Sequence, residues 1–291
     1  MSRIDEIYIK KASEIIYNGY SEKDLNKNVR PVWLDEKGNE LQAYTNYLTQ
    51  QFVVYEINEV PIINLRKIAW KTAIKEILWI YQDRSNDVNK LKEKYNVNYW
   101  DSWTNELGNL GTAYGHQINK DFISPETGLK TNQIDRLIEQ LKNNPLNRRL
   151  IINLYDVDDL SNMTLIPCAF LTMWSVRGEY LDMTLIQRSG DFLAAAGPGC
   201  INAFQYYVLL RMISQVTGYK AGKFTHFVQN LHIYDKHFDI VKELISETTS
   251  IKAPNLWINP EIKNFYDFSI EDFKLENYNP LDKKYIIPIA I

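Results

Sequence analysis

The stretch PCAFLTMWSVRGEYLDMTLIQRSGD, residues 167–191, decides the expected architecture. Its segments 170–176 and 180–187 have the composition of strands, and the second alternates apolar with polar residues. The residues between them, Arg177-Gly178-Glu179, are typical of a hairpin turn. We therefore predict an antiparallel hairpin at the centre of the chain.

A cysteine stands at the start of this hairpin. Cys168 follows Pro167 at the mouth of the first strand, and antiparallel pairing brings Arg188 back alongside it. A guanidinium near a thiol stabilises the thiolate, which is the reactive form of cysteine. Two interpretations of Cys168 stay open at this point: a buried packing thiol, or an activated nucleophile.

Amphipathic and apolar runs on either side of the hairpin predict further helices and strands. Helices are expected at residues 5–18, 66–82, 133–142 and 203–219, and strands at 149–155 and 223–234. Helices and strands are intermixed, and no stretch has the composition of a linker between domains. We expect an α+β fold in which residues 1–291 form a single domain, with a large mixed β-sheet covered by helices.

The composition excludes several classes of protein. The chain has 291 residues, of which 45% are hydrophobic and 24% charged, and its net charge of −3 gives no general signal for nucleic acid. Its two cysteines, Cys168 and Cys200, have the spacing of neither a disulfide scaffold nor a metal site. The sequence contains no apolar leader and no apolar run long enough to span a membrane. We expect a reduced, cytoplasmic protein that binds no metal.

Charged residues offer candidate sites that also have plain structural interpretations. Glu76 borders the apolar stripe of the helix at 66–82, where a carboxylate usually faces water. Arg148 and Arg149 are adjacent in a predicted strand, so they should point to opposite faces. They could bind anions at a subunit boundary or form a solvated basic loop.

Aromatic residues are ambiguous in the same way. His232 and Tyr234 lie on one side of a predicted strand and could hold a sugar hydroxyl, although a buried histidine in the core has the same pattern. Trp100 could form a stacking wall or belong to the core. Tyr114 precedes a glycine in a turn and places a phenol close to backbone.

Taken in order, these segments resemble the thymidylate synthases over nearly the whole chain. The shared signature is a Pro-Cys pair, a later Gln-Arg-Ser-x-Asp run, an Asn before an apolar helix, and a His-x-Tyr. It stands here as Pro167-Cys168, Gln187-Arg188-Ser189-Gly190-Asp191, Asn202 and His232-Ile233-Tyr234. The segments around Glu76, Trp100, Tyr114 and Arg148-Arg149 and the terminal Pro288-Ile289-Ala290-Ile291 also match.

The resemblance implies a methyltransferase that converts dUMP to dTMP by reductive methylation. 5,10-Methylenetetrahydrofolate would supply both the one-carbon unit and the hydride. Cys168 would add to C6 of the uracil, Arg188 would activate that thiol, and Asn202 would bind the amide edge of the base. Glu76 would manage protons through water, and Tyr114 would assist removal of the C5 proton.

The same resemblance implies how the rest of the two ligands would be held. Phosphate would be bound by Arg30, Arg148, Arg149, Arg188 and Ser189, ribose by His232 and Tyr234, folate by Trp100, Leu165 and Ile291, and Asp191 would contribute to both ligand sites. Arg148 and Arg149 would be donated to the partner's site, so the enzyme would be a homodimer that forms through the sheet. Nucleic acid is not expected as a partner beyond possible binding to its own mRNA.

Three features depart from the family's pattern. Ala169 stands where His is frequent after the cysteine, and Gln229-Asn230 replaces a Gly-Asp pair. The segment from Asp191 to Asn202 is longer than usual, which puts the shape of the folate pocket in question. This segment carries Cys200, which we expect to be a buried packing thiol.

Two other functions stay open. A pyrimidine hydroxymethylase would use the same cysteine addition and let water, instead of hydride, complete the reaction. Asn202 argues against the cytosine-specific kind, in which an Asp is expected, but not against a dUMP hydroxymethyltransferase. The other alternative is a catalytically silent homologue that binds a nucleotide or RNA.

Overall fold

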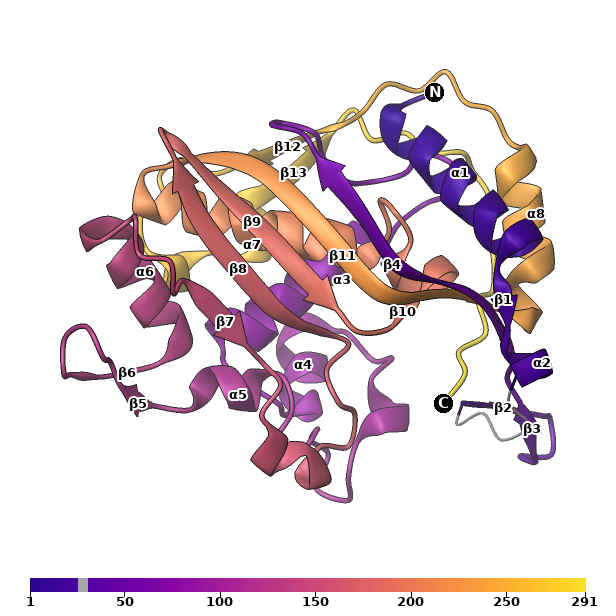
Figure 1. Cartoon of the computed structure of the whole chain (residues 1–291), viewed down its shortest axis with the longest axis horizontal. Helices are drawn as coiled ribbons and strands as arrows, with labels where there is room; N and C mark the ends of the chain where they lie inside the picture. Colours follow the sequence, from indigo (N-terminus) through magenta and orange to yellow (C-terminus); the bar gives the residue numbers. More distant parts are fainter. Residues whose placement is uncertain (26–30) are drawn as a thin grey trace.

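The computed structural model describes residues 1–25 and 31–291, which build a seven-stranded sheet (Figure 1). The strand order is β1–β4–β11–β9–β8–β7, and β10 pairs with β11. The bounds are β1 (Tyr20–Ser21), β4 (Thr45–Tyr55), β7 (Ile151–Asn153), β8 (Ala169–Arg177), β9 (Tyr180–Gln187), β10 (Gly190–Asp191) and β11 (Lys220–Tyr234). β11 is parallel to β9 and β10 but antiparallel to β4, so the sheet is mixed, as expected.

The helices and the small hairpins surround this sheet. The α-helices are α1 (Arg3–Asn18), α2 (Glu22–Leu25), α3 (Trp70–Ile77), α4 (Val88–Tyr95), α5 (Gly115–Asn119), α6 (Gln133–Asn143), α7 (Ile201–Thr217) and α8 (Phe238–Ser246). Two-stranded pairs join β2 (Val32–Leu34) to β3 (Glu40–Gln42), β5 (Phe122–Ile123) to β6 (Lys130–Thr131), and β12 (Asn255–Ile258) to β13 (Phe273–Glu276). Short 3₁₀ or π turns lie at η1 (Leu78–Gln82), η2 (Asp101–Trp103), η3 (Val157–Asn162), η4 (Phe192–Ala196), η5 (Asp235–His237), η6 (Phe265–Asp267) and η7 (Ile270–Asp272).

The predicted central hairpin is confirmed as β8 and β9. Arg177 pairs with Tyr180 across the turn, and Gly178 there has a φ of +59°, a conformation that glycine adopts without steric cost. At the other end of the hairpin Ala169 pairs with Gln187. The start of β8 and the end of β9 therefore meet, and they bring Cys168 and Arg188 together.

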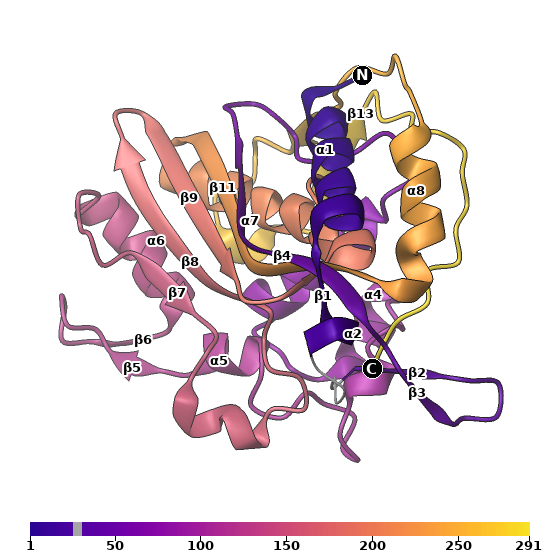
Figure 2. The same cartoon turned by 45° about the vertical axis from the view of Figure 1, so that its right-hand side comes forward.

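One face of the sheet is covered by helices. α7 is almost wholly apolar and buried, as its sequence predicts, and it packs with α3 behind the sheet (Figure 1). α1 and α8 lie side by side at the end of the sheet formed by β1 and β4 (Figures 1 and 2). α1 begins at a capping box in which Ser2 and Asp5 exchange hydrogen bonds, which fixes its start.

The opposite face of the sheet carries an apolar row that the described residues leave uncovered. Strand register places Leu171, Ile186, Phe227 and Phe52 side by side on β8, β9, β11 and β4. None of the four is buried, and Phe52 is 61% exposed. Such a row on a monomer is typical of a surface that another chain covers.

Two local predictions need correction, and one strand was missed. The helix expected at 66–82 begins only at Trp70 and continues after Ile77 as the π-helical turn η1. Arg148 and Arg149 lie in a turn before β7 and are both exposed, so they are not strand residues that point to opposite faces. Strand β4 was not predicted, because most of its residues are half-buried or exposed on both faces and show no clear alternation.

No helix in the described ranges has the length and apolar composition needed to cross a membrane.

Candidate active site

The two ends of the β8–β9 hairpin place an arginine beside the half-buried Cys168. The backbone N–H of Arg188 donates to the carbonyl of Cys168 at 2.9 Å. The guanidinium donates from Nε to the Pro167 carbonyl at 3.1 Å and from Nη2 to the Ile166 carbonyl at 2.6 Å. Arg188 thus anchors the segment that leads to Cys168, and the predicted closeness of the two residues is confirmed.

Phenols form the wall next to this cysteine. Tyr114 makes a hydrogen bond with the backbone of Cys168, and burial raises its pKa well above the usual range, with the nearby Cys168 acting in the same direction. Tyr206, from α7, donates to the carbonyl of Ala169 at 3.2 Å and accepts from Tyr81 at 3.1 Å. Both phenols near the sulfur therefore stay protonated and can donate hydrogen bonds.

Tyr114 is held in an unusual backbone conformation. Its φ is +49° and its ψ −110°, in a region that non-glycine residues rarely adopt. Its neighbour Gly115 has no room for a side chain, because an added Cβ would lie 2.0 Å from the Ser85 carbonyl oxygen. Backbone strain of this kind costs free energy and is concentrated at functional sites.

Glu76 is buried at 3% exposure, so the expectation that it faces water is wrong. The indole of Trp100 donates to Oε1, and the side-chain amide of Gln205 donates to Oε2. Burial raises the pKa of Glu76 to about 7, although the hydrogen bonds from Tyr99, Trp100 and Gln205 favour the ionised form. A carboxyl with this pKa can take up or release a proton near neutral pH.

The indole that contacts Glu76 belongs to an aromatic cluster. Trp100 lies edge-on to Tyr114 at 5.3 Å between ring centroids and to Trp103 at 5.8 Å, and it stacks on Tyr99 at 6.1 Å. This cluster joins the surroundings of Glu76 to those of Cys168 and forms an aromatic wall beside both.

Asn202 lies at the start of α7 between two glutamines. Its Oδ1 accepts from Gln187 at 3.1 Å, and its Nδ2 donates to Gln205 at 3.0 Å. Each of these two atoms can make one further hydrogen bond. Asn202 therefore presents one donor and one acceptor in a fixed orientation.

Asp191, His232 and Tyr234 form a neighbouring polar group. Asp191 pairs with His232 across β10 and β11, and the His232 ring lies 5.0 Å from that of Tyr234. The Asp191 carboxylate caps η4, and its Oδ1 lies 3.5 Å from Nδ1 of His237. Burial opposes ionisation of Asp191, but His237, His232 and the Ala194 N–H together lower the pKa of Asp191.

His237 also reaches the C-terminal segment. Its Nε2 bonds the Pro288 carbonyl at 2.8 Å, and Ile291 pairs with Val32 through two backbone hydrogen bonds of 2.9 and 3.0 Å. The C-terminal segment is thereby attached next to Asp191.

The longer segment after Asp191 is ordered and buried. It forms the π turn η4 and then packs Cys200 at 0% exposure, which confirms the prediction of a buried thiol. The buried guanidinium of Arg66 donates to the Leu193 carbonyl and lies 3.6 Å from the Cys200 sulfur. Cys200 is therefore enclosed below the site and does not face it.

The remaining predicted residues lie at the margin of this cluster or outside it. Ser189 and Leu165 are half-buried on the segments that flank Arg188 and Cys168. Arg148 and Arg149 are exposed ahead of β7, whose start lies opposite the middle of β8 and away from Cys168. Arg30 lies outside the described residues.

Sequence reasoning missed Gln205, Tyr206 and His237. Gln205 stands three residues after Asn202 on a helix, and this spacing puts both on one helix face. A polar residue within the apolar first half of the helix was the signal that could have identified it.

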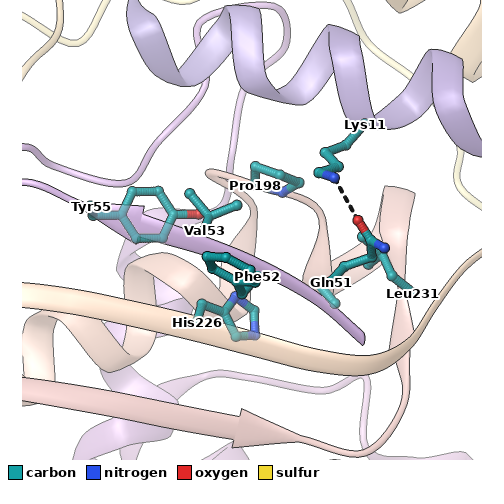
Figure 3. Close-up of a pocket in the computed structure, with 9 residues that line it drawn as sticks. Lys11, Gln51, Phe52, Val53, Tyr55, Pro198, His226 and Leu231 are labelled. Carbon is teal, nitrogen blue, oxygen red and sulfur yellow. Dashed lines mark hydrogen bonds between the residues drawn. The ribbon is translucent and has the colours of Figure 1, made fainter. Parts of the chain in front are cut away.

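A small pocket lies between α1, β4, β11 and the segment that contains Pro198 (Figure 3). Figure 3 shows Lys11 from α1 bonded to Gln51 of β4, with Pro198 and the ring of His226 nearby. Its volume of about 10 Å³ accommodates a water molecule at most. The pocket is too small to be a nucleotide site.

Comparisons with known proteins agree with the geometry. The family model described as thymidylate synthase matches residues 6–290. The chain is 44% identical to the thymidylate synthase of Bacillus subtilis subsp. natto over 97% of this chain and 98% of that one, and also 44% identical to that of Bacillus phage phi3T over the same shares. It matches a solved structure, thermostable thymidylate synthase A from Bacillus subtilis, with a TM-score of 0.90, 41% identity and full coverage of both chains.

The chain belongs to the thymidylate synthase family. The predicted α+β fold and the predicted methyltransferase activity are confirmed at this level, and the comparisons do not favour the alternative functions. The family implies a folate co-substrate. Across residues 1–25 and 31–291 no group of three or more His, Cys, Asp or Glu side chains is arranged to hold a metal ion.

Proposed function

We propose that the chain catalyses the reductive methylation of dUMP to dTMP through a covalent bond between Cys168 and C6 of the uracil. The observation that carries the proposal is the joint position of Cys168, Arg188 and Tyr114 next to the buried Glu76, whose pKa is about 7. These groups supply a nucleophile, a positive charge that favours its thiolate, and a proton carrier. 5,10-Methylenetetrahydrofolate would supply the one-carbon unit and the hydride.

The nucleophile would be activated by its fixed surroundings. Arg188 is held by the carbonyls of Ile166 and Pro167, so its charge is fixed next to the segment that carries Cys168 and would favour the thiolate without any rearrangement. Tyr114 would assist removal of the proton from C5. Glu76 would transfer protons through water at O4 of the base. Catalysis would need both groups because the C5 proton must leave after the one-carbon unit has been attached.

Asn202 would recognise the pyrimidine base through hydrogen bonds. Its Nδ2 can donate to O4 and its Oδ1 can accept from N3–H, which matches uracil and mismatches cytosine. Gln187 and Gln205 hold this orientation, as described above. His232 and Tyr234 would bind the ribose hydroxyl, and Ser189 and Arg188 the phosphate, with Arg30 as a further phosphate ligand.

The folate would lie against the aromatic wall. Trp100 would contact the folate as part of this wall, and Leu165, half-buried on the segment before Cys168, would offer an apolar contact. The contacts of Asp191 with η4 and His237 use Oδ1, so Oδ2 can accept from the ligand. Ile291 would close over the two ligands and exclude water.

We also propose that residues 1–291 act as one domain in a cytoplasmic homodimer that forms through the sheet. The support is the uncovered apolar row of Leu171, Ile186, Phe227 and Phe52. The exposed Arg148 and Arg149 would reach the partner's phosphate site from the edge of this face. A cytoplasmic setting would keep the Cys168 thiol reduced.

The product assay tests the proposal. Incubation with dUMP and methylenetetrahydrofolate should yield dTMP and dihydrofolate in equal amounts. Cys168→Ala should abolish turnover and keep dUMP binding, and 5-fluoro-dUMP with folate should give an adduct at Cys168. Hydroxymethyl-dUMP without dihydrofolate, or an adduct at Cys200, would contradict the proposal.

A further inference from the structure

Gln205 joins the two polar residues that the proposed reaction places on opposite sides of the base. Its Nε2 donates to Oε2 of Glu76, and its Oε1 accepts from Nδ2 of Asn202 at 3.0 Å. It is 6% exposed and lies on the buried helix α7. The residue next to the nucleophile, Ala169, carries no polar side-chain atom that could take part in this link.

The hydrogen bonds of this link all run in one direction, from donor to acceptor, and the series continues beyond Asn202. Gln187 donates from Nε2 to Asn202 and accepts at Oε1 from the ring of His226, 2.8 Å away. Burial lowers the pKa of His226 to about 3, so this ring is neutral and its Nε2 carries the proton. From His226 to Glu76 each side chain donates to the next, and the series ends on a carboxylate.

Because every hydrogen bond in this series runs the same way, none of its amide side chains can rotate by 180° without losing a bond. A flip of the Gln205 amide would set its oxygen against a carboxylate oxygen of Glu76. A flip of Asn202 would oppose two oxygens at Gln205 and two N–H groups at Gln187. The ionised Glu76 therefore fixes the orientation of Asn202 through two hydrogen bonds, with Gln205 between them. Under the proposed function, this is the orientation in which Asn202 pairs with uracil.

We propose that Gln205 is a positioning residue that couples the proton carrier Glu76 to the base-reading Asn202. This coupling rests on the proposed function, which gives Glu76 and Asn202 roles in the same reaction. Gln205 favours the ionised form of Glu76 and, through its oxygen, the uracil-reading orientation of Asn202. Loss of Gln205 should therefore affect proton transfer and base binding together.

The groups that surround Glu76 allow the effect on pH to be assigned. Tyr99 faces it from the segment before η2, Trp100 from the same segment, and Tyr206 from α7 beside Gln205. Burial raises the pKa of both phenols, so neither changes charge near neutral pH. Neither phenol therefore produces a limb of the pH profile near pH 7, and the proposal assigns a limb in this range to Glu76.

The test is Gln205→Leu in the full-length protein, with kcat, the dUMP KM and the pH profile of kcat as readouts. We expect kcat to fall about 10-fold or more, because the lost hydrogen bond goes to a charged group, and the KM for dUMP to rise. The limb near pH 7 should move to higher pH, by about one pH unit, whichever protonation state of Glu76 is active. A limb that stays at the wild-type position overturns the proposal.

Controls separate this proposal from a folding defect and from the reaction itself. Gln215→Leu removes a half-buried glutamine near the other end of α7, whose amide donates to the carbonyls of Asn259 and Ile262, and should leave the KM and the limb at wild-type values. Gln205→Glu keeps the side-chain length and brings a second carboxyl against Glu76, so it should also move the limb, and it decides the question where Gln205→Leu does not fold. Wild-type protein that makes no dTMP refutes the proposed function, whereas a Gln205 variant that behaves as wild type refutes only the coupling.

Discussion

At the scale of the residue, Glu76 shows what the sequence could and could not predict. The helical period placed it beside the apolar stripe of its helix, where a carboxylate is expected to face water. It is buried because the segment that carries Tyr99 and Trp100 covers it, and such a contact between distant segments leaves no periodic signal. Only the family resemblance indicated that this carboxyl has a chemical role.

Burial of Glu76 makes the stability of the protein depend on pH. Its pKa is about 7 in the folded chain against an ordinary value of 4.5, so the folded state binds the proton more tightly. The resulting stabilisation is complete below pH 4.5 and is lost as the pH rises through 7. This is the reverse of the usual behaviour of a carboxylate in an ion pair.

We predict that the advantage of the wild type over Glu76→Gln in the free energy of unfolding decreases by about 3 kcal/mol between pH 4 and pH 8. Glu76→Gln has no group that titrates at this position. Urea unfolding at both pH values measures the difference, and Glu36→Gln, which removes an exposed carboxyl, is the control. A difference that is independent of pH would show that the pKa of Glu76 is the same in the folded and unfolded chains.

At the scale of the element, the β8–β9 hairpin was predictable and the helix at 66–82 was not wholly so. Turn composition and alternation determine a hairpin locally, and its register then brings Cys168 to Arg188. The change from α-helix to the π turn η1 lies within the apolar run Leu78–Tyr81, where the residue pattern is the same for both kinds of helix. Gly115 is another local feature whose reason, the Ser85 carbonyl, is distant in sequence.

We predict that Gly115→Ala destabilises the protein by about 2 kcal/mol or more and lowers activity, because the new Cβ would displace the turn that holds Tyr114. The matched control is Gly178→Ala in the β8–β9 turn, where φ is +59° and no atom lies within 4 Å of the added Cβ. This control should cost only about 1 kcal/mol of backbone strain. Thermal unfolding and kcat measure both variants, and equal effects would refute the steric explanation.

At the scale of the whole molecule, the order of motifs predicted the cluster around Cys168 but not how it would be completed. Cys168, Arg188, Asn202 and His232 meet because they lie at strand ends and a helix start of one sheet layer. The exposed Arg148 and Arg149 stay apart from this cluster, and their place in a site is a property of two chains. The relation between two chains cannot be read from the pattern of one.

We predict that two inactive variants restore activity when mixed. Arg148→Ala/Arg149→Ala lacks the arginines that a partner would receive, and Cys168→Ala lacks the nucleophile. After dissociation and random reassociation, half of the dimers are mixed and each has one complete site, so about a quarter of the wild-type activity should return. The measurement is dTMP formation before and after mixing, and no recovery would contradict donation of arginines between subunits.

The contrast between the two cysteines gives the molecule an internal reporter. The sulfur of Cys168 is half-buried in the site, whereas that of Cys200 is at 0% exposure beside Arg66. An alkylating reagent therefore meets one thiol in the native chain and two in the denatured chain. The stoichiometry of modification counts folded molecules, and protection of the first thiol by a nucleotide measures occupancy of the site without any label being introduced.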